Sequence, residues 1–386
     1  MLPDISIRGV QFILNPRRWS NLSYANVATT SEKAHLASLE WSESLARGGS
    51  AEFDGDAEKN ALLPLRNATS RLLSCDEDDI CVGSSATEII CSLAWAFSPT
   101  KDSNIVSTRS AFPSTVYPWR RVAEENGANI RLADYDSNLY TRQEDIFDLI
   151  DEQTSIVAIS HVEYSNGQRY DLKKISEVAH SVGAAVIVDA TQSMGVLPIE
   201  AAKTGVDAIV SSGYKWLRGS YGAAVAYISP DLIRDLNPGL VGFRSHYDLW
   251  DLKAERLELP MDASRFEYTT LHFGAALGLA ASINEINHIG IDEVWSMANH
   301  LSNLVIEGAS KLGLEVVSPL SENERSAIVS IRPPKGLNSE HISRTLLDEF
   351  GIVVSSRSGL IRISPHFVNK GEEIQDLLDA LGGMIS

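Results

Sequence analysis

Short apolar runs rich in β-branched residues alternate with helical segments between about residues 78 and 230 of this 386-residue chain. The segment DLKKISEVAHSVG (171–183) is typical of the helical ones, because its apolar residues follow helical spacing and a glycine ends it. This alternation predicts an α/β fold with a mostly parallel, doubly wound sheet that helices cover on both faces. The predicted strands are NIVST (104–108), SIVAIS (155–160), AAVIVDA (184–190), DAIVSS (207–212) and GAAVAYIS (222–229).

The pattern changes from about residue 290 onward. Amphipathic helical segments and the strand-like runs SAIVSIRPP and LIRISP predict a smaller α+β domain there. We therefore expect a large, ligand-binding domain at 20–255 and a small domain formed by 1–19 together with 275–386. The segment 242–270 lacks clear periodicity and is a candidate active-site and interface loop.

Composition argues against several classes of partner and compartment. The 33 basic and 51 acidic residues give a net charge of −18, which opposes binding to nucleic acid or an anionic membrane. Cys75, Cys81 and Cys91 form no C-x-x-C pair, so we expect reduced thiols in a cytoplasmic protein, with neither disulfides nor a metal site. Asp4 and Arg8 interrupt the apolar start, which argues against a secretory signal, and no apolar stretch approaches the ~20 residues of a membrane span.

Ligands of doubly wound sheets bind beyond the carboxyl ends of the strands, and three polar groups are expected there. Residues 85–87 begin a helix whose free amides favour a phosphate, although a helix cap without any ligand is the common alternative. Asp189 ends a buried strand, where it either pairs with a cationic ring nitrogen or caps a helix. Lys215 follows the next strand and is either an amine kept partly neutral to attack a carbonyl or a snorkelling surface lysine.

The three groups together describe a binding site for pyridoxal 5′-phosphate. The helix start would hold the phosphate, and the lysine amine would form a Schiff base with the aldehyde. The carboxylate would keep the ring nitrogen protonated, so that the ring can accept electrons from a bound substrate.

The sequence resembles the class V aminotransferases, which are fold type I pyridoxal-phosphate enzymes. This family includes cysteine desulfurases, kynureninases, cysteine C–S lyases and an epimerase. The resemblance covers most of the chain and rests on segments that occur in family order: GSSATE (83–88), SHVEYSNGQ (160–168), VDATQSMGVLPI (188–199), SSGYKWLRGSYG (211–222), RFEYTT (265–270) and LIRIS (360–364).

The resemblance implies a role for each matching residue. Lys215 would carry the Schiff base, Asp189 would bind the ring nitrogen, and Gln192 would approach the 3-oxygen of the ring. Arg362 would bind the substrate α-carboxylate through its planar fork, although the alternation in LIRIS also fits a surface strand arginine. The other implied cofactor contacts are Ser85, Ala86, Thr87, Ser212 and Tyr214, with Thr270 supplied by the second subunit of a homodimer that shares its active sites.

Two aromatic residues and a set of basic residues complete the predicted site. Phe112 falls where the family places a ring over the cofactor, with ordinary core packing as the alternative, and Tyr164 is a further cofactor contact. Recognition of the substrate side chain is expected from residues 17–28, 112–119 and 242–250. Their basic members, Arg17, Arg18 and Arg244, either bind a second acidic group on the substrate or form a solvated surface.

Departures from the family pattern bear on the reaction. Residues 92–386 contain no cysteine, whereas cysteine desulfurases need one in a small-domain loop to take up sulfur. Tyr164 stands where desulfurases place asparagine, and the segment NPGLVGFRS (237–245) resembles the cysteine/cystine C–S lyase and kynureninase-like branch. We therefore predict a lyase that acts on a small or S-substituted α-amino acid and expels a Cβ substituent, with sulfur as the expected leaving atom, through cofactor-bound intermediates.

The sequence is also compatible with other functions. An aminotransferase, an epimerase or a decarboxylating enzyme would use the same cofactor and the same three residues, 189, 192 and 215. A non-catalytic relative would not need an intact lysine, aspartate and arginine. A nicotinamide enzyme would suit the sheet pattern, but no G-x-G-x-x-G joins a strand to a helix in this sequence.

Overall fold

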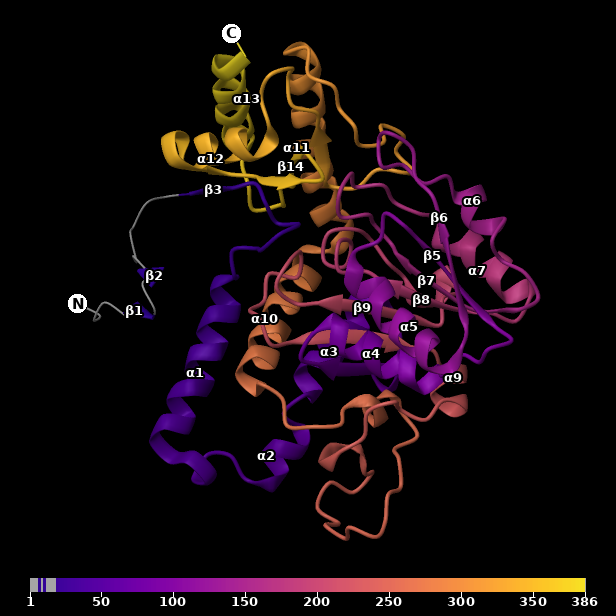
Figure 1. The fold of residues 1–386 in the computed structure, drawn as a ribbon. Helices are drawn as coiled ribbons and strands as arrows, with labels where there is room; N and C mark the ends of the chain where they lie inside the picture. The colour runs from indigo at the N-terminus through magenta and orange to yellow at the C-terminus, as the bar shows by residue number, and fades with distance from the viewer. Residues whose placement is uncertain (1–5, 8–9, 12–18, 386) are drawn as a thin grey trace.

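The strands expected from the sequence belong to one seven-stranded sheet, which has the order β4–β10–β9–β8–β7–β5–β6. All of its neighbouring pairs are parallel except those of β10, which runs antiparallel to both β4 and β9. The computed structural model describes residues 6–7, 10–11 and 19–385 (Figure 1). The strands of this sheet are β4 Ile80–Gly83, β5 Asn104–Thr108, β6 Asn129–Ala133, β7 Thr154–Ser160, β8 Ala185–Asp189, β9 Ala208–Ser212 and β10 Ala224–Ile228.

Helices cover both faces of the sheet, as the continuous apolar runs predict. Alternate residues of β8 show this: Val186 and Val188 pack with α3, α7 and α10, whereas Ile187 packs with α4, α5 and α9 on the opposite face. The fold class expected from the sequence is therefore confirmed. The helices of this part of the chain are α1 Glu32–Gly48, α2 Gly55–Asn60, α3 Leu63–Leu73, α4 Ala86–Phe97, α5 Pro113–Asn126, α6 Gln143–Phe147, α7 Leu172–Ser181, α8 Ala201–Thr204, α9 Pro230–Asp235 and α10 Phe273–Ile289.

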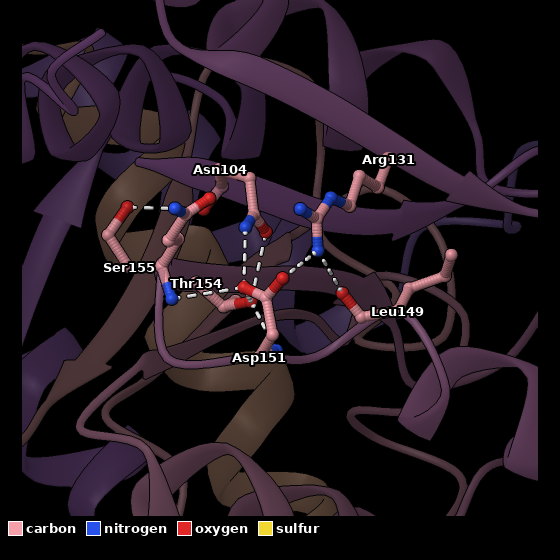
Figure 2. Close-up of polar contacts among 7 residues, drawn as sticks. Asn104, Arg131, Leu149, Asp151, Thr154 and Ser155 are labelled. Carbon is pink, nitrogen blue, oxygen red and sulfur yellow. Dashed lines mark hydrogen bonds and ion pairs between the residues drawn. The ribbon is translucent and has the colours of Figure 1, made fainter. Parts of the chain in front are cut away.

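A polar cluster fixes the amino-terminal ends of β5, β6 and β7, at the edge of the sheet away from the predicted site (Figure 2). Asp151 accepts hydrogen bonds from Asn104 Nδ2 at 2.9 Å and from Arg131 Nη1 at 2.6 Å. The Arg131 contact lowers the pKa of the Asp151 carboxyl to about 2, so the carboxylate remains ionised at neutral pH. Thr154 Oγ1 donates to Asn104 Oδ1 at 2.9 Å. These contacts connect three neighbouring strands, and the opposite ends of two of them, β5 and β7, lead to residues that line the predicted site.

The small domain lies at one end of the molecule, where α11, α12 and α13 are found together with the sheet β11–β14–β13 (Figure 1). Ser20 and Asn21 form β3, which pairs in parallel with β12. Arg17 and Arg18 lie outside the described residues. The remaining elements are β1 Ser6–Ile7, β2 Val10–Gln11, β3 Ser20–Asn21, α11 Ile291–Lys311, β11 Val329–Ile331, α12 Ser339–Phe350, β12 Ile352–Val353, β13 Ser355–Arg357, β14 Leu360–Ile363 and α13 Gly371–Ile385.

The segment between α9 and α10 extends from the end of the molecule opposite the small domain (Figure 1). It contains only two short 3-10 turns, Phe243–Ser245 and Ala263–Phe266, as its lack of periodicity predicts. Within the described part of the chain, no helix combines the length and the apolar character that crossing a membrane requires.

Candidate active site

A cavity lies beyond the carboxyl ends of β4, β5, β7, β8 and β9, where the topology predicts a ligand site. Its empty space, with the open mouth included, measures about 420 Å³. All the cofactor residues predicted from the sequence line it except Ser85 and Thr270. The lining residues are Ala86, Thr87, Phe112, Ser114, Ser160, Val162, Tyr164, Asp189, Thr191, Gln192, Ser212, Tyr214 and Lys215.

The start of α4 supplies the polar end of this cavity. Ser85 caps the helix, because its side chain accepts a hydrogen bond from the backbone amide of Glu88, and so its hydroxyl serves the helix rather than the cavity. The Ala86 amide donates to Ser212 Oγ at 3.1 Å. The Thr87 amide has no acceptor among the residues that the structure describes, and Thr87 Oγ1 donates to Ser114 Oγ at 3.0 Å. A free amide and three hydroxyls at a helix start form a binding site for an anion.

Asp189 lies at the end of β8, where two donors hold its carboxylate. The Thr191 amide donates to Oδ1 at 2.9 Å, and the Thr115 hydroxyl donates to Oδ2 at 3.0 Å. The side chain is buried, so these hydrogen bonds offset the cost of removing the carboxylate from water. Asp189 therefore presents a fixed acceptor to the cavity.

Lys215 is buried in the turn after β9 and faces aromatic rings. Its Nζ lies 5.5 Å from the ring centre of Phe112 and 5.8 Å from that of Tyr214. Burial lowers the pKa of the amine from 10.5 to about 8; Asp189 opposes this shift, while the cations Arg362 and Arg357 add to it. An appreciable fraction of this amine is therefore neutral and nucleophilic near neutral pH.

Arg362 is a buried arginine, 1% exposed, on the central strand β14 of the small-domain sheet. Its strand neighbours on either side are Ser330 and Ser355, whose small side chains leave room for the guanidinium. Nη1 donates to the Tyr164 carbonyl at 2.7 Å, but Nε and Nη2 are buried without a partner. Burial lowers the pKa of this guanidinium to about 9. These two nitrogens form one edge of the planar fork, which matches the two oxygens of a carboxylate.

Phe112 and Tyr164 line the mouth, with ring centres 5.3 Å apart in an edge-to-face arrangement. Phe112 is 42% exposed, so it is not packed in the core as the alternative interpretation supposed. Gln192 spans the cavity wall, where its amide nitrogen donates to the Ala25 carbonyl at 3.0 Å and its oxygen accepts from Trp216 Nε1 at 2.9 Å. The amide orientation of Gln192 is thereby fixed.

Arg362 does not line this cavity, although its charge acts on Lys215 and its guanidinium bonds the Tyr164 carbonyl. Two further predicted residues, Thr270 and Arg244, lie away from the cavity within the chain. Thr270 is exposed and does not line it. Arg244 lines a different cavity, near the buried pair formed by Arg66 and Glu267, and its Nη1 donates to the Glu58 carbonyl at 3.1 Å. In a single chain, neither residue belongs to the group around Lys215.

Four hydroxyl residues at the cavity received no individual role from the sequence: Ser114, Thr115, Ser160 and Thr191, the first two within the range 112–119 expected to recognise the substrate. Ser114 and Thr115 belong to the first turn of α5, and Thr191 follows Asp189. The sequence signal was their place directly after predicted strand ends, which does not distinguish a site hydroxyl from a helix-capping one.

The cysteines lie apart from the cavity. None of them lines it, and Cys81 is fully buried in β4. Burial raises the pKa of all three thiols, that of Cys75 to about 12. Thiols with raised pKa values carry little thiolate at neutral pH, so they are poor nucleophiles.

The donor set of the cavity fits pyridoxal 5′-phosphate. The free Thr87 amide and the neighbouring hydroxyls suit a phosphate, the fixed Asp189 carboxylate suits a protonated ring nitrogen, and the partly neutral Lys215 amine suits an aldehyde. The unpaired edge of Arg362 is buried beside this cavity rather than lining it, and none of the cofactor groups requires it.

Comparisons with known proteins show the family and the fold of this chain. Residues 38–377 match the family model described as aminotransferase class-V. A probable cysteine desulfurase of Pyrococcus abyssi is 28% identical to this chain, and the match covers 74% of this chain and 73% of the relative. An uncharacterized aminotransferase of Bacillus subtilis, YcbU, is 26% identical, and the match covers 82% of this chain and 82% of the relative. The structure of a cystine C–S lyase, C-DES, with its product cysteine persulfide superimposes with a TM-score of 0.87 at 22% identity, covering 94% of this chain and 97% of the other.

Proposed function

This chain belongs to the class V aminotransferases and is a pyridoxal-phosphate-dependent enzyme, and from that premise we propose that it is a lyase that breaks a Cβ–S bond of a small or S-substituted α-amino acid. The cofactor, when bound, supplies an electron-accepting ring that acidifies the Cα proton of the substrate. All other steps depend on side chains of the chain itself.

Arg362 orients the substrate in this proposal. Its unpaired Nε and Nη2 take the α-carboxylate, while the bond from Nη1 to the Tyr164 carbonyl holds the guanidinium plane. The Lys215 amine then takes the Cα proton, for which a pKa of about 8 suits it as a base near neutral pH. The Cβ–S bond breaks with its electron pair on sulfur, which leaves and takes up a proton. Water then hydrolyses the released imine to a 2-oxo acid and ammonia.

We favour a lyase over a desulfurase because of where the cysteine thiols lie. A desulfurase transfers sulfur to a cysteine that reaches the substrate, whereas the cavity lining contains no cysteine. Burial also raises the pKa of all three thiols, which favours their protonated, less nucleophilic form. Relatives named cysteine desulfurase therefore share the fold and the family, and we propose that this chain differs from them in the fate of the sulfur.

We expect the holoenzyme to convert L-cysteine, L-cystine or an S-alkylcysteine into pyruvate, ammonia and a sulfur product, with no 2-oxo acid added. Pyruvate is measured with lactate dehydrogenase and sulfur by methylene blue formation. Formation of alanine instead of pyruvate would indicate a desulfurase. Turnover that requires an added 2-oxo acid would indicate an aminotransferase.

The matched control is a variant in which Cys75, Cys81 and Cys91 are all replaced by alanine. A lyase of the proposed kind keeps its kcat within about threefold, because none of the thiols touches the reacting atoms. Loss of turnover in a variant that stays folded by circular dichroism would contradict the proposal.

We further propose that two copies of the chain associate through the loop between α9 and α10. Thr270 is exposed outside the cavity of its own chain, and the loop before it exposes large apolar side chains, which soluble monomers rarely cluster. These side chains are Val241, Phe243, Tyr247, Trp250, Leu252, Leu257 and Met261.

Sedimentation at micromolar concentration is expected to give twice the mass of one chain. Replacing Leu252, which is 71% exposed, with aspartate should shift the protein toward a monomer and lower its cofactor occupancy. The control is Leu347→Asp on α12 of the small domain, which should leave the mass unchanged. A wild-type monomer under these conditions contradicts the proposed association.

A further inference from the structure

The first turn of α5 contacts both ends of the cavity. Ser114 Oγ accepts from Thr87 Oγ1 at the phosphate end, and the Thr115 hydroxyl donates to Asp189 Oδ2 at 3.0 Å. Thr115 is only 2% exposed. A threonine in a helix commonly donates to the carbonyl one turn earlier. Here the hydroxyl instead reaches a residue 74 positions away in the sequence.

The bond between Thr115 and Asp189 favours the ionised carboxylate. A hydroxyl that donates to a buried carboxylate stabilises its charge, and the Thr191 amide does the same at Oδ1. An ionised carboxylate accepts at both oxygens, which matches the two donors present.

We propose that Thr115 is a positioning residue that keeps a proton on the ring nitrogen of bound pyridoxal phosphate. A proton between Asp189 and the ring nitrogen resides on whichever atom is the stronger base. The Thr115 hydroxyl already donates to Asp189 Oδ2, and a proton on that carboxyl would weaken this hydrogen bond, so the proton stays on the ring, where it makes the ring an electron acceptor. The inference rests on the proposed role of Asp189 but not on the identity of the substrate.

The test follows the ring nitrogen directly in holoenzyme loaded with ¹⁵N-ring-labelled pyridoxal phosphate, by solid-state ¹⁵N NMR. In the wild type we expect a protonated-pyridine resonance. In Thr115→Val, which keeps the side-chain shape and removes the hydroxyl, we expect the proton equilibrium to shift about tenfold toward Asp189, since that is the effect of one hydrogen bond to a charged group. Thr115→Ser should restore the wild-type resonance.

Kinetics provide a second readout that a purely structural role would not produce. Thr115→Val should lower kcat about tenfold and leave KM unchanged, because the Arg362 edge is not altered. Thr69→Val is the matched control, since Thr69 is a buried helical threonine that bonds the Leu65 carbonyl at 2.8 Å, and it should match the wild type in both experiments.

The possible outcomes distinguish the role of Thr115 from the role of Asp189. A folded, loaded Thr115→Val enzyme with the wild-type resonance overturns the role of Thr115, and Thr115→Ala tests the same point should the valine variant fail to load. An unprotonated ring nitrogen in the wild type overturns the role of Asp189 itself. Neither result depends on whether the enzyme produces pyruvate, so failure of the lyase proposal remains distinguishable.

Discussion

Replacing Lys215 with alanine is expected to abolish covalent attachment of pyridoxal phosphate and to lower turnover by at least about 10³-fold. The residue supplies both the amine that holds the aldehyde and the base that moves the Cα proton, and general-base catalysis alone contributes about 10²–10⁴-fold. Attachment is measured by borohydride reduction followed by peptide mass spectrometry, and turnover by pyruvate release.

The pH dependence of attachment in the wild type is a second signature of the same amine. The neutral form attacks the aldehyde, and burial lowers the pKa to about 8, so the rate of cofactor capture by the apoenzyme should rise with pH and level off above about pH 8. Below this value the rate should fall about tenfold per pH unit, because the neutral fraction falls by that factor. An unperturbed lysine would reach its plateau only above about pH 10.

The control for Lys215 is Lys203→Ala. Lys203 is an exposed lysine that pairs with Glu200 at 2.7 Å, and its loss should change neither attachment nor turnover. Borohydride trapping at another lysine in the Lys215→Ala enzyme, with turnover preserved, would disprove the assignment.

Replacing Arg362 with glutamine should lower kcat/KM for an α-amino acid by about 10²–10³-fold, mainly through KM. The buried guanidinium presents two unpaired nitrogens, and loss of one member of a buried charged pair costs about 2–5 kcal/mol. Arg362→Lys should recover only part of this loss, because an ammonium lacks the planar fork. Steady-state kinetics with the amino acid and with its decarboxylated amine analogue measure the effect, and only the former should respond.

The same replacement of Arg362 should weaken substrate binding without destabilising the folded apoenzyme. A buried cation with no acidic partner in the described part of the chain is costly, so Arg362→Gln should not lower the midpoint of thermal unfolding of the apoenzyme. Arg47→Gln, at an exposed helix pair, is the control for kinetics and unfolding. A large loss of stability with KM unchanged would show that Arg362 is a structural residue.

The order of strands and helices could be read from the sequence because both faces of the sheet are buried. NIVST matches β5 residue for residue, and the start of α4 was located to within one residue by the cap at Ser85. Such features depend on neighbours in the sequence: periodicity for the strand and one side-chain bond to a nearby amide for the cap. The strand β6, with its partly exposed sequence NIRLA, was not recognised, because it lies at the sheet edge and lacks a continuous apolar run.

The sequence by itself determined the fold class and the residues at strand ends, among them Asp189, Gln192 and Lys215. The carboxyl ends of parallel strands must meet at one edge, so their side chains converge whatever the loops do. Only the tertiary structure decided the contacts between distant segments, such as Thr115 with Asp189 and Arg362 with the Tyr164 carbonyl. A hydrogen bond between residues 74 or 198 positions apart depends on how helices and domains pack, and no local pattern encodes that packing.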